Sequence, residues 1–245
     1  MATDAGNDAW DKLWREKHSQ ELWSRPDGDV RSLLPLLKAE GVRRVLDLGC
    51  GIGRHVVMFA GEGFEVEATD SSAAGVEYCR QWLQVEGLTA TVALSDMSNI
   101  DFPDGFFDFV LSWNVVYHAT RSSMMAVIDE IRRVTRDSGL AYLTFNSTKN
   151  SHYGKGVEVE SHTFDDPKRD HGHHLHHYSD ERDVRGLLSA WRIEAINHQG
   201  ERLAGPVCPG SWHWMVLARK APPLSTARSN KHSGSATSSA PTRDW

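Results

Sequence analysis

The fold is decided by the stretch Val45-Leu46-Asp47-Leu48-Gly49-Cys50-Gly51-Ile52-Gly53. Its mostly apolar first half predicts a buried strand, and its three alternating glycines predict a tight turn that leads into a helix from about Arg54. Glycine tolerates positive φ and lets a ligand approach the backbone, while the free N–H groups that open a helix attract an anionic group. The stretch therefore predicts a strand, turn and helix unit that binds a ligand.

Alternating strand and helix patterns continue on the C-terminal side of this unit. Short β-rich segments are predicted at residues 44–48, 65–69, 90–93, 107–112 and 140–145. Helical segments are predicted between them at residues 54–60, 75–85 and 124–134. Strands separated by helices imply right-handed crossovers. We expect a doubly wound α/β fold with a mostly parallel sheet and helices on both faces.

The two ends of the chain differ from this central part. At the N-terminus, residues 8–23 carry apolar side chains at helical spacing and a second helix is expected at 30–39. The first helix either packs against the core for stability or caps a ligand cleft, and the sequence leaves both open. Towards the C-terminus, Ser179 is expected to cap a helix ending near residue 190, and strands are expected at 192–197 and 212–218. We divide the chain into a cap helix (1–28), a main domain (29–220) and a Ser- and Pro-rich tail (221–245) predicted to be disordered.

Bulk composition restricts the functional class. A chain of 245 residues suits one large core, and its net charge of −6 offers no overall attraction to nucleic acid. The three cysteines are far apart and form no CxxC pair, which favours a reducing compartment over a disulfide framework. The polar start and the lack of a long apolar run predict a cytoplasmic protein without a membrane partner. Composition leaves the oligomeric state open.

Acidic residues at the ends of the predicted strands restrict the class of ligand that the turn can bind. A nicotinamide fingerprint would have two residues between its second and third glycines, whereas one residue separates Gly51 from Gly53. Asp47 would repel a pyrophosphate but suits a cationic amino group. Asp70 ends the second strand, where a carboxylate can accept both ribose hydroxyls. Asp96 follows the third strand and is placed to accept from an adenine amino group, while Met97 would pack on the ring.

These motifs resemble the class I S-adenosylmethionine-dependent methyltransferase family over roughly residues 30–220. Residues 107–112 resemble its fourth strand, and residues 130–141 resemble its next helix, turn and fifth strand. The resemblance implies seven strands in the order 3-2-1-4-5-7-6 with the seventh antiparallel, and S-adenosylmethionine as the cofactor. It places these residues at the cofactor: Asp47, Gly49, Cys50, Gly51, Gly53, Asp70, Ser71, Asp96, Met97 and Trp113. A nucleotide-binding or structural α/β domain without methyl transfer is the alternative.

Candidate catalytic residues follow the fourth strand, which borders the methyl group in the resembling family. Transfer from a sulfonium is an in-line displacement, so the protein mainly aligns the nucleophile and removes its proton where necessary. His118 is placed as a base or orienting group, or alternatively as a hydrogen-bonded histidine beside the cofactor. Asn114 and Tyr117 are expected to orient the substrate. Cys50 is interpreted as a small buried residue and not as a nucleophile.

Residues 147–178 form an insertion that contains more than half of the histidines. Two imidazoles and a carboxylate suffice for a zinc, iron or manganese site, and the weak candidates are Glu160, His162, His174 and His177. Their spacing matches no fixed metal motif, and polar histidine-rich loops are often only solvated, so no metal is expected. We expect the insertion to form a substrate lid over the ends of the fourth and fifth strands.

Together these features predict an enzyme that methylates a small molecule, with no nucleic-acid partner. Among relatives, the chain most resembles the small tellurite-resistance and thiol-type methyltransferases, which suggests a thiol, a chalcogen compound or an oxygen or nitrogen nucleophile as the acceptor. One alternative is a methyltransferase acting on RNA or protein, but no strong Lys/Arg cluster and no Asn-Pro-Pro-Tyr motif is present. A second alternative is a metal-binding sensor protein with the same fold.

Overall fold

The computed structural model describes residues 4–167, 175–200 and 210–221. The predicted tail from residue 222 onward and the candidate ligand His174 lie outside the described residues. Within the described part, none of the helices combines the length and the hydropathy that a bilayer crossing requires.

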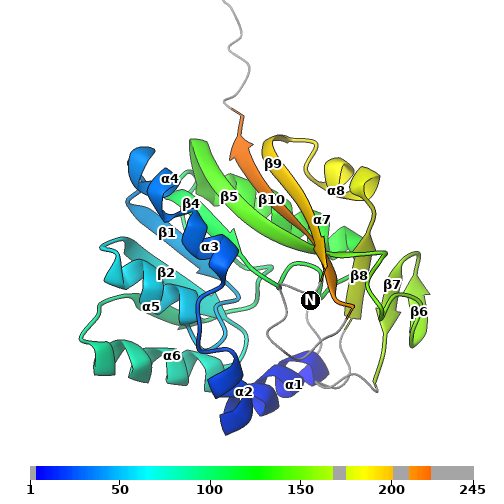
Figure 1. Cartoon of the computed structure of the whole chain (residues 1–245), viewed down its shortest axis with the longest axis horizontal. Coiled ribbons are helices and arrows are strands. Elements are labelled where there is room, and N and C mark those ends of the chain that lie inside the picture. The colour runs from blue at the N-terminus through cyan, green and yellow to red at the C-terminus, as the bar shows by residue number, and fades with distance from the viewer. Residues whose placement is uncertain (1–3, 168–174, 201–209, 222–245) are drawn as a thin grey trace, which may run out of the picture.

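The centre of the fold is a twisted sheet that grows outward from β1 (Figure 1). Its main strands are β1 (Arg44–Leu48), β2 (Glu65–Asp70), β3 (Thr91–Leu94), β4 (Phe107–Ser112), β5 (Thr135–Ser147), β9 (Trp191–Gly200) and β10 (Trp212–Lys220). Strand β1 pairs in parallel with β2 on one side and with β4 on the other, and β10 is antiparallel to both β5 and β9. Read across the sheet, these strands follow the predicted order 3-2-1-4-5-7-6, with β10 as the antiparallel seventh strand.

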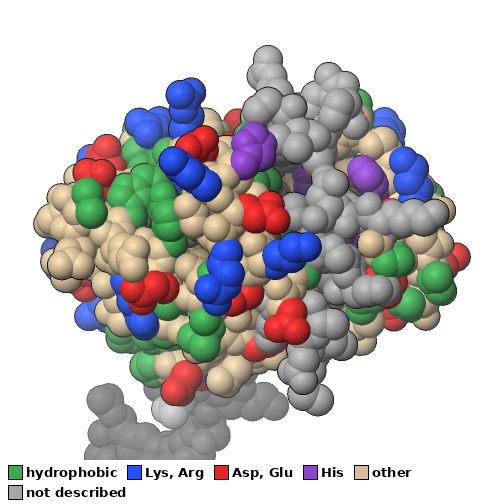
Figure 2. All heavy atoms as spheres, turned by 90° about the horizontal axis from the view of Figure 1, so that it is seen from below, with side chains coloured by type: hydrophobic (Ala, Val, Ile, Leu, Met, Phe, Trp, Pro, Cys, Tyr) green, Lys and Arg blue, Asp and Glu red, His purple; other side chains and the backbone are tan. Residues whose placement is uncertain are grey.

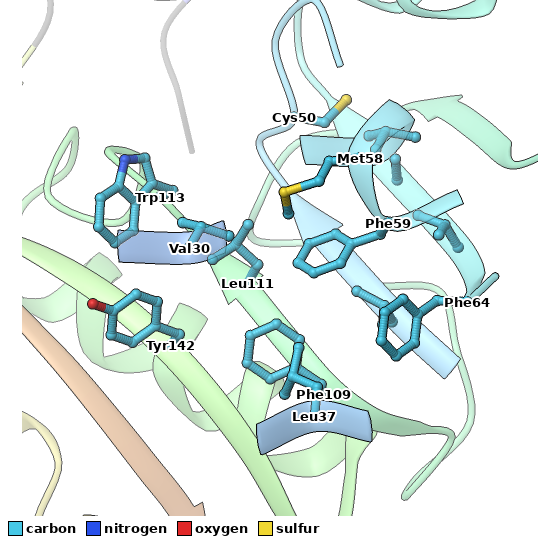
Figure 3. Packing of buried hydrophobic residues seen from close by; sticks show 14 of the residues in the cluster. Val30, Leu37, Cys50, Met58, Phe59, Phe64, Phe109, Leu111, Trp113 and Tyr142 are labelled. Atoms are coloured by element: carbon cyan, nitrogen blue, oxygen red, sulfur yellow. The ribbon is translucent and has the colours of Figure 1, made fainter. Parts of the chain in front are cut away.

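Helices cover both faces of this sheet and form two apolar clusters. One face carries α3 (Gly28–Ser32), α4 (Leu34–Ala39), α5 (Arg54–Gly61) and α6 (Ala73–Glu86). The other face carries α7 (Arg121–Val134) and α8 (Glu181–Leu187). Figure 3 shows the first cluster, in which Phe59 and Phe109 pack near its centre and Trp113 lies beside Tyr142 at its edge. Both faces are thus buried, as the apolar runs in the strands predicted.

The N-terminal segment forms more and shorter helices than the sequence predicted. It forms two helices, α1 (Asp4–Arg15) and α2 (Lys17–Leu22), because Glu16 has an extended backbone conformation between them. The second predicted helix is divided into α3 and α4, and Pro35 lies in the first turn of α4, where its missing N–H costs no hydrogen bond. The predicted helix cap Ser179 is also wrong by one residue. Asp180 is the N-cap of α8, and its side chain accepts from the Asp183 N–H.

The described part of the insertion between β5 and α8 contains three strands. Its described part contains the antiparallel hairpin of β6 (Val157–Glu160) and β7 (Thr163–Asp165), followed by β8 (Leu175–Ser179). Strand β8 joins the hairpin through β7 and meets the end of β5 in parallel at Asn146 and Ser147. Strand β8 was not predicted, because its Leu-His-His-Tyr-Ser sequence is mostly polar, although four of its five residues are buried.

Candidate active site

The glycine turn lies at the carboxyl end of β1. Gly49, Gly51 and Gly53 all have positive φ, at 76°, 55° and 89°. The turn is held against β2 because the Gly49 and Cys50 N–H groups both donate to the Thr69 carbonyl, at 2.8 and 3.0 Å. A Cβ on Gly49 would collide with the Val115 side chain, so the loop after β4 packs closely over this turn. The backbone therefore has the shape that the glycines predicted, with no room for a larger residue.

Cys50 lies inside this turn and is buried. A hydrogen bond with the Cys79 thiol and burial raise its pKa well above the ordinary value. A thiol that stays protonated is a poor nucleophile, which agrees with the interpretation of Cys50 as a packing residue.

Asp70 is a buried carboxylate at the end of β2, and it organises the turn. Its Oδ2 accepts from the Gly51 N–H at 2.7 Å, and its Oδ1 accepts from the Ser72 N–H at 2.8 Å. Burial raises its pKa, while these backbone donors and that of Ser71 oppose the rise. One carboxylate thus joins the turn after β1 to the turn after β2, at the position predicted to bind ribose hydroxyls.

Asp47 is the more unusual of the two carboxylates. Its side chain is 1% exposed, and within the described residues its Oδ2 has no hydrogen-bond partner. Burial raises its pKa to about 7, and the neighbouring Asp70 adds to this rise while Arg54 opposes it. A buried acceptor without a donor is costly, so a ligand that donates a hydrogen bond there would be favoured.

The end of β3 completes this row of acidic residues. The Ser95 N–H donates to the Asp70 carbonyl at 2.9 Å, which ties the end of β3 to the end of β2. Asp96 follows directly, and its Oδ1 accepts from the Ser98 N–H and hydroxyl at 2.8 and 2.6 Å. Met97 packs on the apolar cluster that covers the α7 face of the sheet.

Helix α1 lies across the glycine turn, along the lower edge of the molecule in Figure 1. Asp11 accepts from the Ser72 hydroxyl at 2.7 Å and from the Ala74 N–H at 2.8 Å, at the start of α6. Burial acts to raise the pKa of Asp11, but hydrogen bonds from Ala74, Ser72 and Arg15 outweigh it and lower the pKa to about 2. A Cβ on Gly51 would lie 2.9 Å from the Trp14 ring. The first helix therefore packs against the predicted ligand turn itself.

The loop after β4 carries the predicted catalytic residues. Asn114 has a φ of 62°, which asparagine tolerates well, and its N–H donates to Thr144 Oγ1 at 2.6 Å. Tyr117 is buried, and its hydroxyl lies 3.4 Å from His213 Nε2. Trp113 packs on Tyr142, with their ring centroids 5.2 Å apart.

His118 lies in an aromatic cluster that the sequence did not predict. Its ring is 4.9 Å from Trp10 of α1, 4.5 Å from Tyr117 and 4.6 Å from His176 of β8, measured between ring centroids. His213 of β10 belongs to the same cluster, because its ring centroid lies 5.6 Å from that of Tyr117. We call Trp10, Tyr117, His118, His176 and His213 the aromatic cluster. Four regions of the chain meet in this cluster. His176 and His213 reach it because β8 and β10 both pair with β5.

A second group missed from the sequence surrounds Arg54, the first residue of α5. Its guanidinium lies 4.9 Å from the Trp23 ring centroid and donates to the Arg25 carbonyl at 3.4 Å. Asp27 also lies close, and its N–H donates to Nε2 of the buried His55 at 3.1 Å. Burial lowers the pKa of His55 well below its ordinary value, so this imidazole is neutral. The only sequence signal for this group was the position of Arg54 directly after the third glycine.

The weak metal candidates do not converge in the described residues, where no group of three or more His, Cys, Asp or Glu side chains could hold an ion. Glu160 accepts from the Arg121 N–H and from the Thr163 hydroxyl. His177 lies 2.7 Å from the same hydroxyl through Nδ1 and 3.0 Å from Asp183 through Nε2. His162 lies 2.7 Å from the Tyr153 hydroxyl. Glu160 and His177 thus serve one network that fastens β7 and β8 to α7 and α8.

A comparison with known protein families matches residues 45–139 to a family described as a methyltransferase domain. This match starts in β1 and covers the glycine turn, Asp70, Asp96 and the loop after β4. Residues 45–139 of the chain are thus similar to a methyltransferase domain. This match agrees with the resemblance that the sequence motifs predicted, and the strand order of the sheet agrees with it as well.

Two kinds of curated relative match parts of the methyltransferase domain. Glycine N-methyltransferase from Oryctolagus cuniculus is 36% identical over 73 residues, which are 26% of this chain and 25% of the relative. The probable S-adenosyl-L-methionine-dependent methyltransferase TehB from Haemophilus influenzae is 26% identical over 96 residues, or 39% of this chain and 33% of TehB. The chain thus matches only a quarter to a third of the length of these relatives.

Solved structures match the methyltransferase domain over more of its length. A methyltransferase from Methanosarcina mazei has a TM-score of 0.64 at 20% identity and covers 73% of this chain and 92% of its own. TehB from Haemophilus influenzae has a TM-score of 0.60 at 18% identity and covers 88% of this chain and 67% of its own. Magnesium protoporphyrin IX methyltransferase from Synechocystis PCC 6803 has a TM-score of 0.62 at 18% identity, with coverage of 90% and 99%. These matches establish the shared fold.

Proposed function

We propose that the chain is an S-adenosylmethionine-dependent methyltransferase that methylates a small molecule. The observation that carries this proposal is the pair of buried carboxylates, Asp47 and Asp70, on the two sides of a positive-φ glycine turn. Asp70 is fixed by two backbone N–H groups and keeps lone pairs for ribose hydroxyls. Asp47 offers its Oδ2, which has no hydrogen-bond partner among the described residues, to a cationic amino group. Their chemistry fits an amino acid joined to a nucleoside.

When bound, S-adenosylmethionine would supply an activated methyl group on a sulfonium. The chain's own residues would then align the acceptor, exclude water and hold a proton. Asn114, Tyr117 and His118 lie in the loop after β4, next to the glycine turn through Val115. We propose His118 as the base for acceptors that lose a proton, since a neutral imidazole can accept one near pH 7.

The acceptor class is proposed from the walls of the site. The aromatic cluster and the packing of α1 over the glycine turn favour a compact acceptor with an apolar or aromatic body. Figure 2 shows the molecule from below, with Lys/Arg and Asp/Glu side chains interspersed over the described part of this face. Nucleic-acid recognition uses a basic stripe, so mixed charge supports a small molecule over RNA. Thiols, chalcogen anions, phenols and amines are the classes to test.

Two measurements test the proposal. Isothermal titration of the full chain with S-adenosylhomocysteine should show binding at one site, and absence of binding would refute the cofactor assignment. A screen of small thiols, selenium and tellurium anions, phenols and amines should then detect S-adenosylhomocysteine formation with one class. Turnover with structured RNA or protein and none with small molecules would contradict the small-molecule acceptor.

A further inference from the structure

The end of β5 carries a buried amide with only one of its two polar atoms in a hydrogen bond. Asn146 is 0% exposed, and its Oδ1 accepts from Asn150 Nδ2 at 3.5 Å. Its own Nδ2 has no hydrogen-bond partner among the residues that the structure describes. A buried N–H donor without an acceptor is costly, so a ligand that brings an acceptor to it would be favoured.

The neighbouring amide shows that the free atom of Asn146 is a donor. The oxygen and nitrogen of an asparagine side chain are told apart by the hydrogen bonds they make. Asn150 Oδ1 accepts from the His152 N–H at 3.0 Å, which leaves Asn150 Nδ2 to face Asn146. Asn146 therefore turns its oxygen to Asn150 and keeps its NH₂ group for another partner. A carbonyl or carboxylate oxygen can accept from this group, whereas an ammonium cannot.

Strand pairing places Asn146 beside the aromatic cluster. It lies directly opposite His213 of β10 and pairs with Tyr178 of β8 on its other side. Residues opposite one another in a sheet share a face, so these three side chains lie on the same side of the sheet. The Tyr117 hydroxyl lies 3.4 Å from His213, and the ring centroids of Tyr178 and His176 are 6.4 Å apart. Asn146 thus has a ring on either side that is in contact with the cluster.

The same face of β5 also holds the loop after β4. Thr144, two residues before Asn146, accepts from the Asn114 N–H at 2.6 Å through its Oγ1. Side chains two residues apart on a strand are about 7 Å apart on one face, so Asn146 is one step beyond this anchor. Val115, the next residue of the loop, packs on the glycine turn. A small acceptor held between the loop and β5 can therefore meet Asn146.

We infer that Asn146 is a specificity-determining residue, whose Nδ2 donates to a carbonyl or carboxylate oxygen of the methyl acceptor. The inference rests on the proposed function and narrows its acceptor to compact aromatic molecules that carry such an oxygen. Asn150 is accordingly a positioning residue, which acts on the acceptor through Asn146. A buried water molecule is the other partner that could accept from Nδ2, and it would give no preference among ligands.

Binding of three fragments to the full chain saturated with S-adenosylhomocysteine tests the inference. The fragments share one benzene ring: benzoate carries a carboxylate, acetophenone a carbonyl and benzylamine an ammonium. In ligand-observed NMR titrations, the wild type should bind benzoate and acetophenone more tightly than benzylamine. Asn146→Ala should bind benzoate about 20-fold and acetophenone about fivefold more weakly, since hydrogen bonds to charged groups are the stronger ones. The fragment that the wild type binds more tightly tells whether the acceptor's oxygen is a carboxylate or a carbonyl.

Asn197 provides a matched control, because it is an exposed strand asparagine that pairs with Met215 in β9. Asn197→Ala should leave the binding of all three fragments unchanged. Asn146→Asp keeps the size of the side chain and an oxygen for Asn150 but replaces the donor, so benzoate should bind at least as weakly as to Asn146→Ala. Asn150→Ala, which only releases the amide, should weaken benzoate about threefold. Unchanged binding of S-adenosylhomocysteine shows that each variant is folded.

The outcomes separate this inference from the proposed function. If the wild type does not bind S-adenosylhomocysteine, the proposed function fails. If it binds S-adenosylhomocysteine but none of the fragments, or binds benzylamine as tightly as the other two, the cofactor assignment stands and the inference is overturned. Fragment binding by Asn146→Ala equal to the wild type would also overturn it, and a lower free energy of unfolding of this variant would then assign the Nδ2 group to a buried water.

Discussion

The two halves of the site are built in different ways. The proposed cofactor half consists of the carboxyl ends of β1, β2 and β3, and the residues proposed to bind the cofactor there lie on one continuous part of the chain, residues 47–97. The proposed acceptor half is the aromatic cluster, whose members come from α1, the loop after β4, β8 and β10. The first half is set by backbone shape and two carboxylates, the second by side chains that converge from distant segments. A single sequence therefore reveals the ligand of the first half better than that of the second.

This contrast predicts that changes in the acceptor half act on turnover and that changes in the cofactor half act on binding. The largest expected effect is that of His118→Gln. Glutamine keeps a polar group but cannot take a proton at neutral pH, so kcat should fall about 10³-fold for an acceptor that needs deprotonation. The affinity for S-adenosylhomocysteine should remain within about twofold. Initial rates and calorimetry measure the two quantities, and the exposed His18→Gln serves as the control.

An unchanged kcat for His118→Gln would show that His118 is a hydrogen-bonded neighbour of the cofactor and not a base. A large loss of affinity for S-adenosylhomocysteine would show that His118 also contributes to cofactor binding, so that the two halves are not separate.

The next largest effect is expected for Asp70→Ala. It removes the acceptor of the Gly51 and Ser72 N–H groups as well as the ribose site, so S-adenosylhomocysteine affinity should fall about 100-fold. The free energy of unfolding should also decrease, because two buried donors lose their partner. Calorimetry and urea denaturation measure both changes, with the exposed Asp101→Ala as the control. Affinity equal to the wild type would remove Asp70 from the cofactor site.

A smaller effect tests whether α1 packs on the cofactor half. Gly51→Ala adds a Cβ close to the Trp14 ring at a φ of 55°, whereas Gly63→Ala adds one at a φ of 87° with no atom within 4 Å. Both should lose about 1 kcal/mol of stability from the left-handed conformation. Gly51→Ala should lose about 1 kcal/mol more from displacement of Trp14. Equal midpoints in urea would show that Trp14 does not lie on the turn.

The smallest effect concerns the protonation of Asp47. Its pKa is raised from 3.8 to about 7 in the folded chain, so between these values the folded state binds the extra proton. Stability should therefore decrease as pH rises through about 7, and Asp47→Asn should lack this decrease. Binding of a cationic amino group needs the ionised form, so S-adenosylhomocysteine affinity should rise about tenfold between about pH 6 and pH 8. If the affinity of the wild type for S-adenosylhomocysteine does not change with pH, Asp47 does not bind the ammonium group.

Much of the fold was predictable because its signals are local. The strands at 44–48 and 107–112 were placed at their observed bounds, since apolar runs between turns are typical of strands buried on both faces. The errors fell where tertiary contacts outweigh local preference. The residues of β8 look polar, yet pairing with β5 and β7 buries them.

The sequence by itself determined the backbone shape of the proposed cofactor half, because the three glycines and Asp70 act through the geometry of adjacent strand ends. Only the tertiary structure decided what surrounds this half. Hydrogen bonds from Ser72 and Ala74 to Asp11 hold α1 over the turn, and strand pairing brings His176 and His213 to Tyr117 and His118. Such contacts join residues far apart in the chain, and their energy depends on the position of whole elements, which no local spacing encodes.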